Sequence, residues 1–114
     1  MRNKNTHSIT FKKKLNKCEG VFRAYSELQF KYGDLLEANK DVVQIRANVL
    51  LKDLGLTGSF TSDFVCSKVD GELMVRECVS RKSLMKPSII RMLDASLEYW
   101  TSRGVSDWGI VLDE

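Results

Sequence analysis

Apolar residues recur at helical spacing in the stretch AYSELQFKYGDLLEAN, residues 24–39. Ser26, or a residue just before it, is a suitable N-cap, and Asn39 is a suitable stop signal. Gly33 lowers the helix propensity of the interior. The apolar positions form one stripe, which predicts an amphipathic helix against a core: Tyr25, Leu28, Tyr32, Leu35 and Leu36.

Three later stretches are rich in β-branched and apolar residues and predict strands. The first is 42–51, with a break near Asn48, and it is followed by a predicted loop at 54–58. The other two are 60–68 and 73–80, and Asp70-Gly71 stands between them. Asp-Gly is typical of tight hairpin turns, so these two strands are predicted to pair antiparallel.

A second helix is predicted to start at Pro87, because proline suits the first helical turn, and to end at Gly104 as a left-handed cap. The apolar run WGIVL, 108–112, predicts a strand covered on both faces, and its place after a crossover helix predicts parallel pairing. Trp108 is expected to pack between helix and sheet. The apolar face of the helix is expected to contain Ile89, Ile90, Leu93, Leu97 and Trp100.

The resulting order is helix, strand, strand, strand, helix, strand. It predicts a single αβββαβ sandwich domain of the α/β class, with a mixed sheet that contains an antiparallel hairpin and a parallel last strand. The chain has 114 residues, which suffices for one domain, and 43% of them are hydrophobic.

Composition sets the expected environment. No apolar run approaches the roughly 20 residues that span a bilayer, and the N-terminus lacks the apolar core of a signal peptide. We therefore expect no membrane association. The three cysteines, Cys18, Cys66 and Cys78, lack metal-ligand spacing and are expected to be reduced and buried in a cytoplasmic protein.

Basic residues are concentrated at the start of the chain, although the net charge of +3 is small. Residues 1–20 are expected to form a basic arm that precedes a domain over 21–114. The arm either lies along DNA phosphates or is a solvated terminus, and the sequence leaves both open. The cations before the first acid are Arg2, Lys4, Lys12, Lys13, Lys14 and Lys17.

Two acids of the predicted hairpin, Asp63 and Glu77, are the candidate metal ligands. Side chains alternate between the faces of a strand. A two-residue Asp-Gly turn would place Asp63 opposite Cys78, so the two acids would point to opposite faces. A three-residue loop or a bulge shifts the register by one and would place both carboxylates on one face.

On a shared face the two carboxylates would repel each other unless a cation lay between them, and Mg²⁺ or Mn²⁺ is the expected ion. Such an ion can polarise a phosphoryl oxygen and activate water. The alternative is that Asp63 and Glu77 lie on an exposed face and pair with Arg76 or Arg81.

The order of elements, with TSD opening the second strand and an acid on the third, resembles the PD-(D/E)xK, or restriction-endonuclease-like, nuclease superfamily. Within it, YSELQFKYGDLLEANKDVVQIRANV, FTSDFV and DGELMVRECV resemble the N-terminal endonuclease domain of TnsA-type transposition proteins. The resemblance runs from about Tyr25 to Val111. It implies Mg²⁺-dependent hydrolysis of a DNA phosphodiester, with Asp63 and Glu77 as ligands and the carbonyl of Cys78 as a further one.

Two positions depart from the family pattern. The usual lysine, two residues after the second acid, is Val79, which neither donates a hydrogen bond nor stabilises negative charge. Lys82 or Arg81, or Lys86 at the start of the second helix, are the substitutes that the sequence offers.

The usual acid of the first helix aligns with Gln29. Glu27 supplies the carboxylate that this position usually carries. Gln29, however, flanks the apolar stripe whereas Glu27 points to solvent, so geometry favours Gln29.

The expected function is therefore a metal-dependent DNA endonuclease of TnsA type in transposon or phage-related DNA processing, with transposition or phage proteins as further partners. Lys12, Lys13, Lys14, Lys17 and Lys86 are its expected DNA contacts. The alternative is a catalytically weak or inactive nuclease-fold subunit that binds DNA or a partner protein. Small nucleases of this fold often dimerise to cut both strands, so a homodimer is one expected state.

Overall fold

The structure is a computed structural model, and it describes residues 2–3, 11–51 and 60–113. The loop predicted at 54–58 lies outside these residues. The elements, in chain order, are β1 (Arg2–Asn3), β2 (Phe11–Lys14), β3 (Val21–Ala24), α1 (Glu27–Ala38), β4 (Val42–Leu50), β5 (Phe60–Lys68), β6 (Leu73–Val79), the 3₁₀ turn η1 (Arg81–Ser83), α2 (Pro87–Thr101) and β7 (Asp107–Leu112).

The main sheet is mixed and contains five strands in the order β1-β5-β6-β7, with β4 paired to β5. β5 pairs antiparallel with β4 and β6, and β7 pairs parallel with β6. The predicted order α1-β4-β5-β6-α2-β7, the hairpin and the parallel last strand are all present. The chain is thus an α/β domain with two helices and a mixed sheet.

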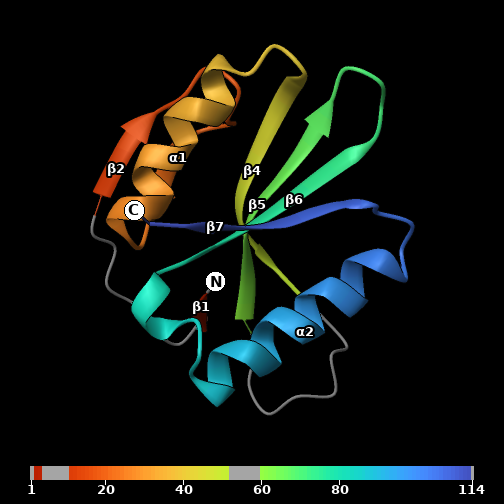
Figure 1. Cartoon of the computed structure of the whole chain (residues 1–114). Coiled ribbons are helices and arrows are strands. Elements are labelled where there is room, and N and C mark those ends of the chain that lie inside the picture. The colour runs from red at the N-terminus through yellow and green to blue at the C-terminus, as the bar shows by residue number, and fades with distance from the viewer. Residues whose placement is uncertain (1, 4–10, 52–59, 114) are drawn as a thin grey trace.

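The two helices lie on opposite sides of the sheet (Figure 1). On the α1 side, Phe64 and Cys66 of β5 pack with Leu36 of α1 and Phe22 of β3. On the α2 side, Val65 and Val75 pack with the ring of Trp100. Alternate residues of β5 therefore serve two separate cores, which is the pattern expected when both faces of a sheet are covered.

Residues 11–24 contain a hairpin that the sequence pattern did not predict. β2 and β3 pair antiparallel as a separate two-stranded sheet, and its inner face packs on α1 through Leu15 and Phe22. Phe22 is 1% exposed. The described parts of the predicted basic arm, 2–3 and 11–20, thus pair or pack with the rest of the domain.

Helix α1 begins at Glu27, three residues later than predicted, because Ala24 belongs to β3. The predicted cap is confirmed: Ser26 is the N-cap, and its hydroxyl accepts from the amide of Gln29 at 3.1 Å. Asn39 is the C-cap.

Three predictions about apolar surfaces were wrong in part. In the predicted stripe of α1, Tyr25 precedes the helix and Leu35 is 64% exposed. Ile90 and Leu97 of α2 are each 40% exposed, and the helix buries Leu93, Ser96 and Trp100 instead. The run of β7 is not covered on both faces throughout, because Ile110 is 41% exposed.

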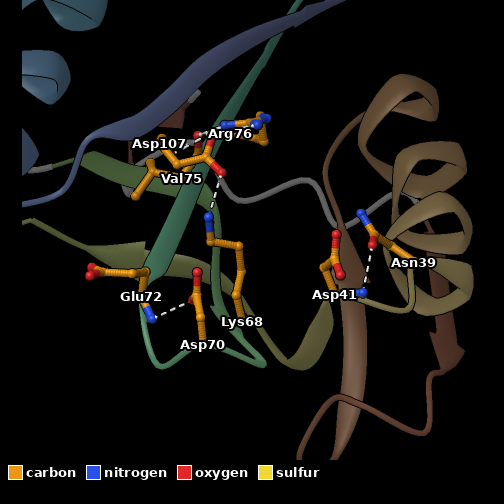
Figure 2. A network of polar contacts seen from close by, with 8 residues as sticks. All are labelled: Asn39, Asp41, Lys68, Asp70, Glu72, Val75, Arg76 and Asp107. Atoms are coloured by element: carbon orange, nitrogen blue, oxygen red, sulfur yellow. Dashed lines mark hydrogen bonds and ion pairs between the residues drawn. The ribbon is translucent and has the colours of Figure 1, made fainter.

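Ion pairs at one end of the sheet hold β7 in register. Figure 2 shows Asp107 between Lys68 of β5 and Arg76 of β6, at 3.0 Å and 2.7 Å. Partial burial raises the pKa of Asp107, but the hydrogen bonds and charges of Arg76 and Lys68 outweigh it, so the net pKa is lowered. Among the described residues, no helix is long and apolar enough to cross a membrane.

Gly33 lets the β2–β3 hairpin approach α1. A Cβ atom at this position would lie 2.7 Å from Cε2 of Phe22, whose ring is enclosed in the core. We expect Gly33→Ala to lower the free energy of unfolding by about 1–3 kcal/mol, because overpacking outweighs the helix propensity that alanine gains. Urea denaturation measures this, with Ala38→Gly as a control that changes propensity without steric conflict. Stabilisation by Gly33→Ala would contradict the close approach.

Candidate functional site

A cleft of about 860 Å³ lies between the first turns of α1 and the ends of the central strands. Polar groups from several elements converge on it, an arrangement common to binding sites. Its polar lining comprises Tyr25, Ser26, Glu27, Gln29, Lys31, Tyr32, Asp63, Ser80, Ser83 and Asp113.

Gln29 reaches the interior of this cleft. It is 1% exposed, and its Nε2 donates to Oδ1 of Asn48 at 2.9 Å and to the carbonyl of Asp63 at 3.3 Å. Its Oε1 accepts from the amide of Tyr25 at 2.9 Å. Glu27 is exposed and pairs with Lys31 at 2.8 Å. Of the two helix candidates, the structure therefore brings Gln29 to Asp63.

Glu27 is held by its neighbour one helical turn away. The hydrogen bond from Lys31, and then its charge, lower the pKa of the Glu27 carboxyl. This i,i+4 pair is fully solvated and belongs to the helix surface.

Asp63 lines the cleft, although its side chain is almost enclosed, with 3% of the residue exposed. Its Oδ2 accepts from the amide of Cys78 at 2.7 Å. Burial, and then the charges of Asp63 and Glu77, raise the pKa of the Cys78 thiol, so this cysteine stays protonated.

β5 and β6 separate beside Asp63. Their paired residues run from Ser67 opposite Leu73 to Phe64 opposite Arg76. Beyond this point, which we call the fork, β1 pairs with β5 at Phe60 and Thr61. β4 already pairs with β5 at Thr61, so β1 takes the edge that β6 leaves.

At the fork, side chains replace the missing ladder bonds. The amide of Asp63 donates to Oε1 of Glu77 at 2.9 Å, and the amide of Cys78 donates to Oδ2 of Asp63. Buried backbone amides require partners. The two acids thus satisfy the amides of the opposite strand.

Glu77 is fully enclosed on the α2 side of the sheet, with 0% of the residue exposed. Its Oε2 accepts from the hydroxyls of Ser62 and Ser96, both at 2.6 Å. Each serine in turn accepts from an indole N–H: Trp100 donates to Ser62 at 2.9 Å, and Trp108 to Ser96 at 3.0 Å. Two indole–serine pairs, from different elements, therefore meet on one carboxylate oxygen.

Burial, and then the nearby charge of Asp63, raise the pKa of Glu77 to about 7, against the lowering effect of the two serine hydroxyls. Every buried side-chain nitrogen and oxygen of the described residues has a hydrogen-bond partner. The carboxyl group of Glu77 is therefore satisfied by protein groups alone.

The hairpin has the three-residue loop that a shared metal site requires, but the two carboxylates do not lie on the same face of the sheet. The loop Val69–Gly71 has three residues, with φ +87° at Gly71 and the amide of Lys68 bonded to the carbonyl of Glu72. The register is thus the one that would pair Asp63 with Glu77. Nevertheless, Glu77 faces α2, and Asp63 does not.

The reason is a local break in the alternation of β5. Ser62 bonds to Trp100 on the α2 side, so the next residue, Asp63, faces the α1 side, where Phe64 also packs. Across the ladder, Asn48 of β4 has φ +55°, a left-handed conformation that asparagine adopts more readily than most residues. The strand is not broken near Asn48 as predicted, because β4 continues through it to Leu50, and its register shift lies between Val42 and Gln44. The exposed-face alternative is also wrong, since both acids are buried, and Arg76 pairs with Asp107 whereas Arg81 donates to the carbonyl of Asp113.

The basic candidates Arg81, Lys82 and Lys86 are not among the residues that line the cleft of Asp63. Val79 is 5% exposed and contributes no charge. Arg81 donates Nε to the carbonyl of Asp113 at 2.7 Å, and its amide donates to Oδ1 of that residue. Lys82 and Lys86 are exposed.

The predicted DNA contacts in β2 and the turn after it divide into two groups. Lys13 pairs with Asp34 at 2.7 Å and lies over the ring of Phe30, and Lys17 donates to the carbonyl of Asn39 at 2.8 Å. Lys12 and Lys14 are exposed.

These residues do not fit the Mg²⁺ or Mn²⁺ site that the resemblance implies. Of the two acids, only Asp63 lines the cleft, and Cys78 offers its amide to Asp63. Within the described ranges, no group of three or more His, Cys, Asp or Glu side chains could hold a metal ion. Comparison of the sequence with protein-family models and with curated proteins gives no match.

Ser62 and Ser96 were missed by sequence reasoning. Ser96 stands between Leu93 and Trp100 at helical spacing, so a polar residue occupies the buried stripe of α2. A small hydroxyl side chain within an apolar stripe, facing a strand with an interior acid, is the signal that could have identified it.

We expect Ser96→Ala to lower the free energy of unfolding by about 1–3 kcal/mol, because Glu77 loses a donor and Trp108 loses an acceptor in a buried site. Urea denaturation measures the change. Ser88→Ala, an exposed substitution on the same helix, is the matched control and should change stability by less than about 0.5 kcal/mol. Equal effects of the two variants would contradict the network.

The raised pKa of Glu77 predicts a pH dependence. Between its ordinary value of 4.5 and about 7, the folded protein binds the proton more tightly than the unfolded chain. Stability from this group is therefore present at low pH and is lost as pH rises through about 7.

Glu77→Gln removes this titration. We expect the wild-type free energy of unfolding, relative to that of Glu77→Gln, to fall by on the order of 3 kcal/mol between pH 4.5 and 7.5. Urea denaturation of both proteins across this range measures the difference. A difference that stays constant with pH would contradict the burial of Glu77.

Proposed function

We propose that this chain is a TnsA-type nuclease-fold domain that binds DNA at the cleft beside Asp63 and, as a single chain, cuts it weakly or not at all. The order α1-β4-β5-β6-α2-β7 supports the restriction-endonuclease-like assignment. So does the position of Asp63 and Gln29, since the residues that the resemblance aligns with two of the family's site positions come together in one cleft.

The position of Glu77 carries the catalytic part of the proposal. Its Oε2 accepts from Ser62 and Ser96 on the α2 side of the sheet, and its Oε1 accepts from the amide of Asp63. A hydrogen bond to a charged group contributes about 1.5–3 kcal/mol, so turning this side chain toward the cleft is costly. Val79, at the usual lysine position, further disfavours cleavage, because loss of one charge stabiliser raises a reaction barrier by about 3 kcal/mol.

Metal-dependent cleavage is the second candidate, and one observation favours it. Glu77 touches the amide of Asp63 at 2.9 Å, so the acids adjoin each other. A rotation of Glu77 into the cleft would create the two-carboxylate arrangement in which Mg²⁺ or Mn²⁺ polarises a phosphate. Arg81 and Lys82 directly follow the cleft residue Ser80 and are the cations that such a site would recruit.

The test combines DNA binding and cleavage. Supercoiled and branched DNA are incubated with the wild type, Asp63→Asn and Glu77→Gln, in Mg²⁺ and in Mn²⁺. We expect wild-type nicking to be no faster than that of the variants. Binding of a labelled duplex, followed by fluorescence anisotropy, should tighten severalfold in Asp63→Asn, because a carboxylate near a phosphate repels it.

Each part can fail separately. Nicking by the wild type that both substitutions abolish would establish the second candidate. Absence of duplex binding by the wild type at low salt would overturn the DNA-binding proposal itself.

A further inference from the structure

A second hollow, of about 360 Å³, lies between β3 and β4. Its lining includes two exposed arginines, Arg23 from β3 and Arg46 from β4, against one acid, Glu19. Tyr25 lines both this hollow and the cleft of Asp63. The two depressions therefore meet at Tyr25.

Asn48 fixes the junction of the two depressions. Its Nδ2 donates to the carbonyl of Arg23 at 2.7 Å, and its Oδ1 accepts from Gln29 of the cleft at 2.9 Å. Its positive φ orients the side chain so that it reaches both Arg23 and Gln29. Strained conformations of this kind persist where the surrounding structure holds them, often at binding sites.

The outer face of the β2–β3 hairpin extends the positive charge. Lys12 lies directly opposite Arg23, and Lys14 lies opposite Val21. Like charges directly opposite each other on paired strands destabilise the pair. Among the described residues, Lys12, Lys14, Arg23 and Arg46 form no ion pair, whereas Lys13 on the inner face is paired with Asp34.

These observations point to a ligand that supplies several negative charges along a line. We infer that Lys14, Lys12, Arg23 and Arg46 form a track for the phosphate backbone of duplex DNA, which leads through the second hollow to Tyr25 and the cleft. A polyanion relieves the repulsion between Lys12 and Arg23, and each phosphate that a cation neutralises releases condensed counterions. This inference rests on the proposed DNA-binding function and names where the backbone runs.

The test measures affinity for a labelled 20-base-pair duplex by fluorescence anisotropy between 0.05 and 0.3 M NaCl. The slope of log affinity against log salt falls by about 0.9 for each phosphate that the protein no longer neutralises. For Arg23→Gln/Arg46→Gln we expect a slope lower by about 1.8, and roughly sixtyfold weaker binding at 0.1 M salt.

The matched control is Lys40→Gln/Arg103→Gln, which removes the same charge from exposed positions that line neither depression. It should change affinity by less than about threefold. A second test variant, Lys12→Gln/Lys14→Gln, should behave like the arginine variant, and it decides the result if thermal melting shows that the arginine variant is misfolded.

The outcomes separate the two proposals. If the wild type binds the duplex and the track variants match the control, the track is wrong and the DNA-binding function stands. If the wild type does not bind at 0.05 M salt, the proposed function fails and the track with it. A reduced slope confined to the track variants supports the inference.

Discussion

The buried carboxyl group of Glu77 is the interaction on which the arrangement of the sheet and α2 depends. An isolated buried charge is strongly unfavourable, so it must be neutralised or surrounded by donors. Here Ser62, Ser96 and the amide of Asp63 surround it, and Trp100 and Trp108 orient the two serines. One group thus links β5, β6, β7 and α2, and breaking any part of it leaves buried polar atoms without partners.

This constraint also shapes the cleft. Because Glu77 draws Ser62 to the α2 side, Asp63 turns to the opposite side, beside Gln29. At the fork between β5 and β6, the two carboxylates accept hydrogen bonds from backbone amides. These bonds replace the missing backbone hydrogen bonds between the two strands. This interior holds one acid at the cleft and uses the other to stabilise the fold, and for that reason we propose binding of DNA rather than cleavage.

Periodic and local signals allowed much of the fold to be predicted. The capping by Ser26, the turn at Gly71 and the parallel last strand followed from spacing and turn chemistry. The predicted stripe of α1 was only partly right, since Leu35 is 64% exposed. β2–β3 escaped notice because each strand has only four residues and three of those in β2 are lysines, which leaves little apolar signal. The orientation of Asp63 could not be predicted, since strict alternation assumes a regular strand, and the left-handed Asn48 belongs to the neighbouring strand. Gln29 was placed correctly because its position relative to an apolar stripe is a property of the helix alone.

A crystal structure of the protein soaked in Mn²⁺, with the ion located by its anomalous scattering, tests the central claim most directly. The account predicts that Glu77 remains hydrogen-bonded to Ser62 and Ser96 and that no ion lies between it and Asp63. An ion held by both carboxylates, with Glu77 turned away from the two serines, would contradict it.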